Sequence, residues 1–248
     1  MIASLPMYDW PETRAANDRF WIIIRDNLRR GDHPAPESLC RMGDPWEHWQ
    51  DPTLFLSQTC GLPYRARLHG KVTLVGTPVH DLPCEPGHYF SVIVARALDE
   101  RREFADFAGA RLAVNDGMSQ SGWAAADAMA RASEIEFSNI IPSGAHRASA
   151  LAVAGGKADL AALDAVTWKL VQKFDDSAMS LRVVATTLPT PALPYITALD
   201  RSPVEIFAAI QDAIEHLDPA DRALLCLKGV TTIPVNRYLE LQTPDTPF

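Results

Sequence analysis

The stretch Asn115-Asp116-Gly117-Met118-Ser119-Gln120-Ser121-Gly122 has residue types and spacing that suit the binding of a small oxyanion. It lies between the apolar run 112–114 and the alanine-rich segment 123–132, which predicts a strand that turns directly into a helix. The first N–H groups of a helix lack intrahelical partners, and serine hydroxyls beside them add hydrogen-bonding groups. Such a helix start binds anions. We therefore single out Ser119, Gln120 and Ser121 as candidate ligand-binding residues.

Two further segments repeat this pattern. Ser143-Gly144-Ala145-His146-Arg147-Ala148-Ser149 precedes an expected helix that stops at Gly155, and it supplies His146 and Ser149 as candidates. The residues Ser57, Gln58 and Thr59 follow the apolar run 54–56 and form a third candidate helix start. The first two starts carry no lysine in the loop itself, so we expect a neutral pocket that holds an oxyanion by hydrogen bonds.

Composition limits the possible partners. At 248 residues and 47% hydrophobic, the chain can bury a full core, as one large domain or as two lobes. Its net charge of −8 argues against nucleic acid or an anionic membrane as the main partner. No apolar run approaches the length of a membrane span, so no direct membrane insertion is expected.

The N-terminal residues 1–8 lack the basic and apolar regions of a secretory signal. As written, the sequence predicts retention in the cytoplasm. A sequence in which a start methionine replaced a signal would look identical, so export to the periplasm stays open.

The four cysteines form no C-x-x-C pair, and free thiols are expected in a reducing compartment. A bridge between Cys60 and Cys84 is the alternative in an exported protein. A metal site built from His80, Cys84 and His88 is disfavoured, because two prolines and a glycine keep this segment from forming an aligning helix. We expect neither a metal nor a cofactor.

Short apolar runs alternate with longer helical patterns, which predicts an α/β layered fold. Strands are expected at 2–7, 54–56, 71–77, 89–96, 112–114, 159–163 and 181–187. Helices are expected after Pro11 up to Gly31, at 37–41, 104–107 and 123–132, after Gly144, after Asp164, from a capping box at 202–205 through Leu217, and from Pro219 to near Gly229. The segment after Leu241 is expected to be loose.

Four motifs in this order resemble the phosphate/phosphite/phosphonate substrate-binding proteins of ABC importers. They are 57–61, 115–122, 144–149 and 158–168, within a match that runs from about Tyr8 to Thr197. The resemblance implies a two-lobed periplasmic-binding-protein type 2 fold, with mixed sheets flanked by helices and two crossing hinge strands near 89–95 and 183–191. Lobe one would comprise 1–88 and 189–248 and lobe two 89–188, with the ligand in the cleft between them.

The resemblance also implies a function, which is to capture a small phosphonate- or phosphate-like anion for an ABC permease in the periplasm. The second lobe would hold the oxyanion with residues 119–121, His146 and Ser149. Asp164 would meet an amino group or a protonated oxygen of the ligand. The other residues implied to line the pocket are Tyr8, Ser57, Gln58, Thr59 and Trp168.

Each candidate residue has a simpler structural role. Ser119 or Ser121 and Asp164 can cap helices, and His146 is a possible capping or surface residue. Tyr8 and Trp168 suit the core.

An enzyme is the main functional alternative. The segment Gly117-Met118-Ser119-Gln120-Ser121 approaches a G-x-S-x-G nucleophile motif, with His146 and Asp164 as potential partners. The last motif position is serine, however, and the chain order of the three residues differs from that of α/β hydrolases. A Cys60 nucleophile with His146 is weaker still, so we expect no enzymatic activity. A cytoplasmic enzyme or sensor of the same fold that binds a phosphorylated metabolite remains the alternative.

Overall fold

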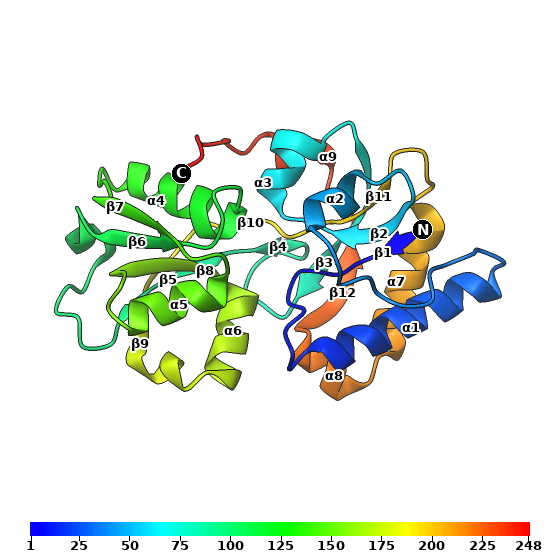
Figure 1. Ribbon diagram of the computed structural model, residues 1–248, viewed down its shortest axis with the longest axis horizontal. Coiled ribbons are helices and arrows are strands. Elements are labelled where there is room, and N and C mark those ends of the chain that lie inside the picture. The colour runs from blue at the N-terminus through cyan, green and yellow to red at the C-terminus, as the bar shows by residue number, and fades with distance from the viewer. The chain divides into compact units, whose positions relative to one another are not determined.

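The computed structural model describes residues 1–248, whose contacts group them into two compact units (Figure 1). Unit 1 comprises 1–88 and 191–241, and unit 2 comprises 89–190 and 242–248. The chain passes between units within β4 (His88–Tyr89) and β10 (Thr190–Pro191), which pair in a two-stranded sheet. The segment 242–248, expected with lobe one, makes its contacts within unit 2.

Unit 1 contains a five-stranded mixed sheet in the order β1-β2-β11-β3-β12. Only the pairing of β1 with β2 is parallel among the pairings described, and β11 and β12 run antiparallel to their neighbours. The strands are β1 (Ile2–Ala3), β2 (Leu54–Gln58), β3 (Val72–His80), β11 (Tyr195–Ala198) and β12 (Leu227–Thr231). The helices are α1 (Arg14–Arg30), α2 (Pro45–Gln50), α3 (Gly61–Pro63) with a π-helical turn (Tyr64–Leu68), α7 (Val204–His216), α8 (Pro219–Leu224) and α9 (Val235–Leu239).

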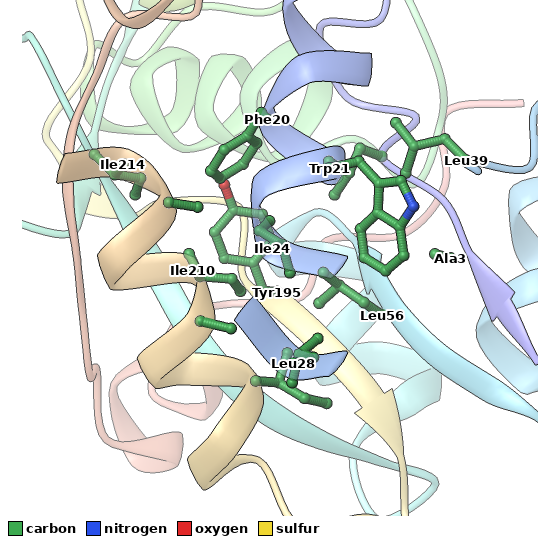
Figure 2. Close-up of a cluster of buried hydrophobic side chains, with 14 of the residues drawn as sticks. Ala3, Phe20, Trp21, Ile24, Leu28, Leu39, Leu56, Tyr195, Ile210 and Ile214 are labelled. Atoms are coloured by element: carbon green, nitrogen blue, oxygen red, sulfur yellow. The ribbon is translucent and has the colours of Figure 1, made fainter. Parts of the chain in front are cut away.

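The main core of unit 1 lies between its sheet and the helices α1 and α7 (Figure 2). Phe20, Ile24 and Leu28 recur every four residues, so they form one apolar stripe along α1, and each is buried. They pack with Ile210 of α7 and Tyr195 of β11. Because successive strand residues point to opposite faces, the next residue of β11 joins a separate cluster that includes Tyr238 and Trp49. Helices therefore cover both faces of this sheet.

Unit 2 contains a second five-stranded sheet in the order β7-β6-β8-β5-β9. β7, β6 and β8 are mutually parallel, whereas β5 is antiparallel to both of its neighbours. The strands are β5 (Ser91–Arg96), β6 (Arg111–Val114), β7 (Asn139–Pro142), β8 (Leu160–Asp164) and β9 (Leu181–Thr186). The helical segments are two 3-10 helices (Phe104–Phe107, Asp176–Ser180), a π-helical turn (Gln120–Ala124), α4 (Ala125–Ala132), α5 (His146–Ala154) and α6 (Ala165–Phe174).

The parallel strands of unit 2 bring three loops to one edge of the sheet. The carboxyl ends of β6, β7 and β8 lead into residues 115–119, residues 143–145 and Asp164. Because neighbouring parallel strands end at the same edge, loops that are far apart in the sequence become neighbours. This is also the edge at which α/β sheets commonly bind ligands.

An ion-pair network stabilises the opposite ends of β6 and β8. Asp159 accepts hydrogen bonds from the backbone N–H of Arg111 (2.9 Å), from its Nε (3.0 Å) and from its Nη2 (3.1 Å). Arg101 and Arg96 each lie 3.5 Å from the same carboxylate. The hydrogen bonds from Arg111 hold the pKa of Asp159 well below its usual range. Likewise, the hydrogen bond from Arg101 lowers the pKa of Asp99 to about 2.

Several sequence-based expectations of secondary structure were wrong. Residues 37–41 are not helical, and the helix of that region is α2, whose N-cap Asp44 accepts a hydrogen bond from the Trp46 N–H. The expected capping box at 202–205 is also absent, since the Ser202 hydroxyl bonds the Glu205 carboxylate and α7 begins without a side-chain cap. Helix α8 ends at Leu224, and β12 occupies the segment expected to continue it.

The Asp159 network gives a test of unit 2 stability. Asp159→Asn removes the charge that several arginine donors share, so we expect a loss of about 2 kcal/mol in the free energy of unfolding. Asp127→Asn is the matched control, because its partner Arg131 lies one helical turn away with a side chain 66% exposed. That change should cost below about 0.5 kcal/mol. Urea unfolding measures both, and equal losses would contradict the assigned role of Asp159.

Candidate functional site

The start of the π-helical turn in unit 2 is fixed by Ser119. Its backbone is extended, and its hydroxyl accepts a hydrogen bond from the Gly122 N–H (2.9 Å). Gly122 cannot carry a side chain, because a Cβ there would lie 1.7 Å from Asn115 Oδ1 and 3.1 Å from His146 Cε1. The glycine therefore allows the loop of residues 115–119 and the ring of His146 to approach the same backbone.

His146 and Ser121 form the centre of the site. His146 is the first residue of α5, and its Nε2 lies 2.9 Å from Ser121 Oγ. The other ring nitrogen, Nδ1, lies 3.1 Å from the carbonyl oxygen of Ala162 in β8. A carbonyl oxygen can only accept, so Nδ1 carries the proton and donates it there. In the neutral ring Nε2 is then an acceptor, and the Ser121 hydroxyl donates to it.

Asp164 lies beside this pair at the carboxyl end of β8. Its Oδ2 is 3.7 Å from His146 Nε2. The same carboxylate caps α6, because Oδ1 accepts from the Thr167 N–H (2.9 Å) and Oδ2 accepts from the Thr167 hydroxyl. Asp164 is therefore both a helix cap and a negative charge next to the imidazole.

Burial keeps His146 neutral. Its side chain is 13% exposed, and removal from water lowers the pKa of the imidazole below its ordinary value of 6.5. The charge of Asp164 and the Ala162 carbonyl oppose this change but are weaker. The site thus presents a neutral histidine and a serine hydroxyl at the start of a helical turn.

This geometry differs from that of a serine hydrolase. In a catalytic triad the serine and the acid bond opposite ring nitrogens, so that the acid orients the histidine. Here Ser121 and Asp164 both face Nε2, and a backbone carbonyl holds Nδ1. Ser119, at the central position of the G-x-S-x-G-like motif, caps the helical turn instead of bonding His146. The three groups therefore lack the relay that activates a serine.

A model of the family described as ABC transporter, phosphonate, periplasmic substrate-binding protein matches residues 57–234. The chain belongs to this family. A comparison with curated proteins yields no match. The resemblance inferred from the four sequence motifs is therefore confirmed, and the phosphonate-binding family consists of transport proteins that capture substrates.

Solved structures share the fold of this chain. PhnD1 from Prochlorococcus marinus, in complex with methylphosphonate, is 16% identical with a TM-score of 0.71, covering 92% of this chain and 91% of that chain. A binding-protein component of an ABC phosphonate transporter from Pseudomonas aeruginosa is 14% identical with a TM-score of 0.72, covering 96% and 83%. XAC2383 from Xanthomonas citri, bound to ATP, is 13% identical with a TM-score of 0.71, covering 97% and 94%. At these identities the likeness shows the fold, and the two-lobed periplasmic-binding-protein fold expected from the sequence is confirmed.

The remaining residues proposed in unit 2 are also buried. Ser149 is fully buried, and its hydroxyl bonds that of Ser143 (2.6 Å). Trp168 is 8% exposed on α6, among residues that are mostly buried. Gln120 is also buried, next to Ser121. Ligand contact by these three side chains stays a prediction.

The candidates in unit 1 cluster around the end of β2. The Ser57 hydroxyl bonds that of Ser4 (2.8 Å), and Gln58 Nε2 donates to the Leu193 carbonyl (3.1 Å). Thr59 is buried, and its hydroxyl has no hydrogen-bond partner. Tyr8 has a positive φ of 61°, uncommon for a residue other than glycine, and its ring meets His80 edge-on at 5.7 Å.

Two residues that position the site were not singled out from the sequence. Ser91, at the start of β5, donates its hydroxyl to the Ser121 carbonyl (2.9 Å) and so anchors the π-helical turn. Thr167 donates twice to Asp164. Thr167 stands three residues after a predicted capping aspartate, so its contact with Asp164 could have been predicted from the sequence. Nothing near Ser91 in the sequence indicates that it bonds a residue 30 positions away.

The structure describes the four cysteines and the surroundings of the side chains that could bind a metal. All four cysteines are free, so the alternative bridge between Cys60 and Cys84 is not formed. Cys84 instead donates its thiol to the His88 carbonyl (3.1 Å). No three histidine, cysteine or acidic side chains gather as metal ligands.

None of the helices has both the length and the apolar character needed to cross a bilayer.

The lowered pKa of His146 makes a prediction about stability. Between the folded pKa and the ordinary value of 6.5, the unfolded chain binds more protons at this residue than the folded chain does. Acidification from pH 7.5 to pH 5 should therefore destabilise the protein through His146. In His146→Gln this contribution disappears, so the free energy of unfolding should depend less on pH. Urea titrations across this range measure the slope, and identical slopes would contradict a buried neutral His146.

Proposed function

We propose that unit 2 binds a phosphonate-like oxyanion at Ser121 and His146 and that the protein delivers this ligand to an ABC permease. The observation that carries the proposal is the buried pair of Ser121 Oγ and His146 Nε2, 2.9 Å apart, at the starts of two helical segments. Helix starts favour anions because their N–H groups point outward and the helix dipole is positive there. Family membership supports the same class of ligand.

A proton on Nε2 would convert the pair into two donors. When His146 is protonated, Nε2 donates to a ligand oxygen and the Ser121 hydroxyl is free to turn towards another. Asp164, 3.7 Å from Nε2, then stabilises the imidazolium. Arg147 is not needed for this, because Asp175 already holds its guanidinium at 2.6 Å. The site thus binds an anion by taking up one proton.

The ligand class follows from the same chemistry. A phosphonate oxyanion presents several acceptor oxygens on one centre and suits donors that converge from two helix starts. PhnD1 from Prochlorococcus marinus binds methylphosphonate, and XAC2383 from Xanthomonas citri binds ATP. Both of these ligands carry such oxygens. We propose that the present chain acts in the periplasm, as its family does, and performs no covalent step, because Asp164 does not orient His146 through Nδ1.

A ligand screen tests this proposal. Methylphosphonate, an aminoalkylphosphonate, inorganic phosphate and ATP are added separately while the melting temperature is measured, with sodium chloride as the ionic-strength control. A ligand that binds only the folded state raises the melting temperature by mass action, so methylphosphonate should give a shift that grows with its concentration. Absence of any shift with all four compounds would contradict the proposal.

Variants localise the binding. Ser121→Ala and His146→Gln each remove a hydrogen-bonding group of the pair, so we expect the affinity for methylphosphonate to fall at least about tenfold. Ser138→Ala and His216→Gln are matched controls, since both residues are exposed and lie outside the site. Calorimetric titration measures the four affinities. If the two site variants bind as tightly as the controls, the Ser121–His146 site is the wrong one.

A further inference from the structure

The segment Gln242–Phe248 follows the last helix of unit 1, yet it makes its contacts within unit 2. It is the red end of the chain in Figure 1. The indole N–H of Trp123 donates to the carbonyl oxygen of Asp245 at 2.8 Å. The hydrogen bond that Arg131 of α4 donates to Asp127 raises the pKa of Arg131, and the charge of Asp245 raises it further. These contacts attach the segment to the helical turn that follows Ser119.

Gly117 provides the second contact surface. A Cβ built on Gly117 would lie 3.1 Å from Pro247 Cδ, 3.6 Å from the Phe248 ring and 3.7 Å from Thr246 Cβ. Its φ is not positive, so the backbone conformation does not itself require glycine. What the missing side chain permits is the close approach of residues 246–248. Gly117 belongs to the same loop as Ser119, so the segment packs directly on the loop of residues 115–119.

The other end of this segment is fastened in unit 1. Tyr238 of α9 is fully buried, and its hydroxyl lies 2.7 Å from Thr77 Oγ1 and donates to the Ala192 carbonyl at 3.0 Å. Only Glu240 and Leu241 separate α9 from the segment that binds unit 2. Two prolines, Pro244 and Pro247, restrict the backbone of that segment. The connection is therefore short and anchored at both ends.

We propose that Gln242–Phe248 is a strap that docks on the Gly117–Trp123 surface of unit 2 and restrains motion between the units. Two crossings of the chain already connect the units through β4 and β10, and the strap adds a third. Motion between the units then requires either release of the strap or bending at Glu240 and Leu241, which join it to α9. The proposal concerns the chain alone and does not depend on the identity of the ligand.

Hydrogen exchange followed by NMR tests the strap without any ligand. The full chain is compared with a chain that ends at Leu241. Without the strap, the Trp123 indole N–H loses its acceptor and should exchange about tenfold faster, the effect of a net hydrogen bond and its neighbouring contacts. We call the backbone N–H groups of Thr187 and Ala192 the hinge amides, because they flank the crossing at β10. Ala192 donates to the Gly87 carbonyl at 2.8 Å and Thr187 donates to the Ser91 carbonyl at 2.9 Å. Both should also exchange about three- to tenfold faster. The amide of Val94, within the unit 2 sheet, should not change.

A glycine substitution in the full chain tests docking of the strap independently of the truncation. Gly117→Ala places a methyl group against Pro247 and should accelerate exchange at Trp123 and at the two hinge amides. Gly229→Ala is the control, because its Cβ would meet no atom within 4 Å and its φ is not positive. It should leave these rates unchanged.

Unchanged exchange at Trp123 after truncation would show that the segment does not dock, and would overturn the proposal. Faster exchange at Trp123 with unchanged hinge amides would show docking without restraint, which also overturns it. Because no ligand is present, these outcomes are separate from success or failure of the oxyanion screen.

Discussion

The hydrogen bond from His146 Nδ1 to the Ala162 carbonyl is the constraint on which the site depends. Ala162 lies in the middle of β8, a strand that is buried along its whole length, so the acceptor is fixed by the sheet. One ring nitrogen is committed to this carbonyl, and the other is thereby aimed at Ser121 and Asp164. The tautomer and the orientation of the imidazole are consequences of the fold.

The order of the strands explains how this constraint arises. His146 follows β7, Ser121 follows β6 and Asp164 ends β8, and these strands are parallel neighbours. Their carboxyl ends meet at one edge of the sheet, where the helical segments that follow β6, β7 and β8 begin. Burial then removes the charge of His146 in the free protein while Asp164 remains close. In the mode of binding proposed above, His146 is neutral in the free protein and accepts a proton when the anion binds.

The sequence indicated which residues lie at the carboxyl edge of the unit 2 sheet, but it did not indicate which partners their side chains bond. Ser119, Ser121 and His146 were singled out from small polar residues at strand-to-helix turns, which carry local signals, whereas Asp164 was predicted as a helix cap, and as a ligand contact only from the family resemblance. The partner of each side chain was not predictable in this way. Ser57 bonds Ser4 and Gln58 donates to the Leu193 carbonyl, pairings that depend on how distant segments pack.

The fold shows the same division between local and distant information. The stripe of Phe20, Ile24 and Leu28 predicted α1 well, because its period is a local property. β12 was missed because it pairs with β3, nearly 150 residues earlier, and the segment 242–248 was expected to be loose because its anchor, Trp123, lies far away in the sequence.

Proton uptake by His146 is tested most directly by the ¹⁵N chemical shifts of its ring nitrogens at pH 7 as methylphosphonate is added. We predict that Nε2 begins as an unprotonated acceptor and becomes protonated in proportion to bound ligand, while Nδ1 stays protonated throughout. If methylphosphonate binds and Nε2 remains unprotonated, His146 is not the group that takes up a proton on anion binding.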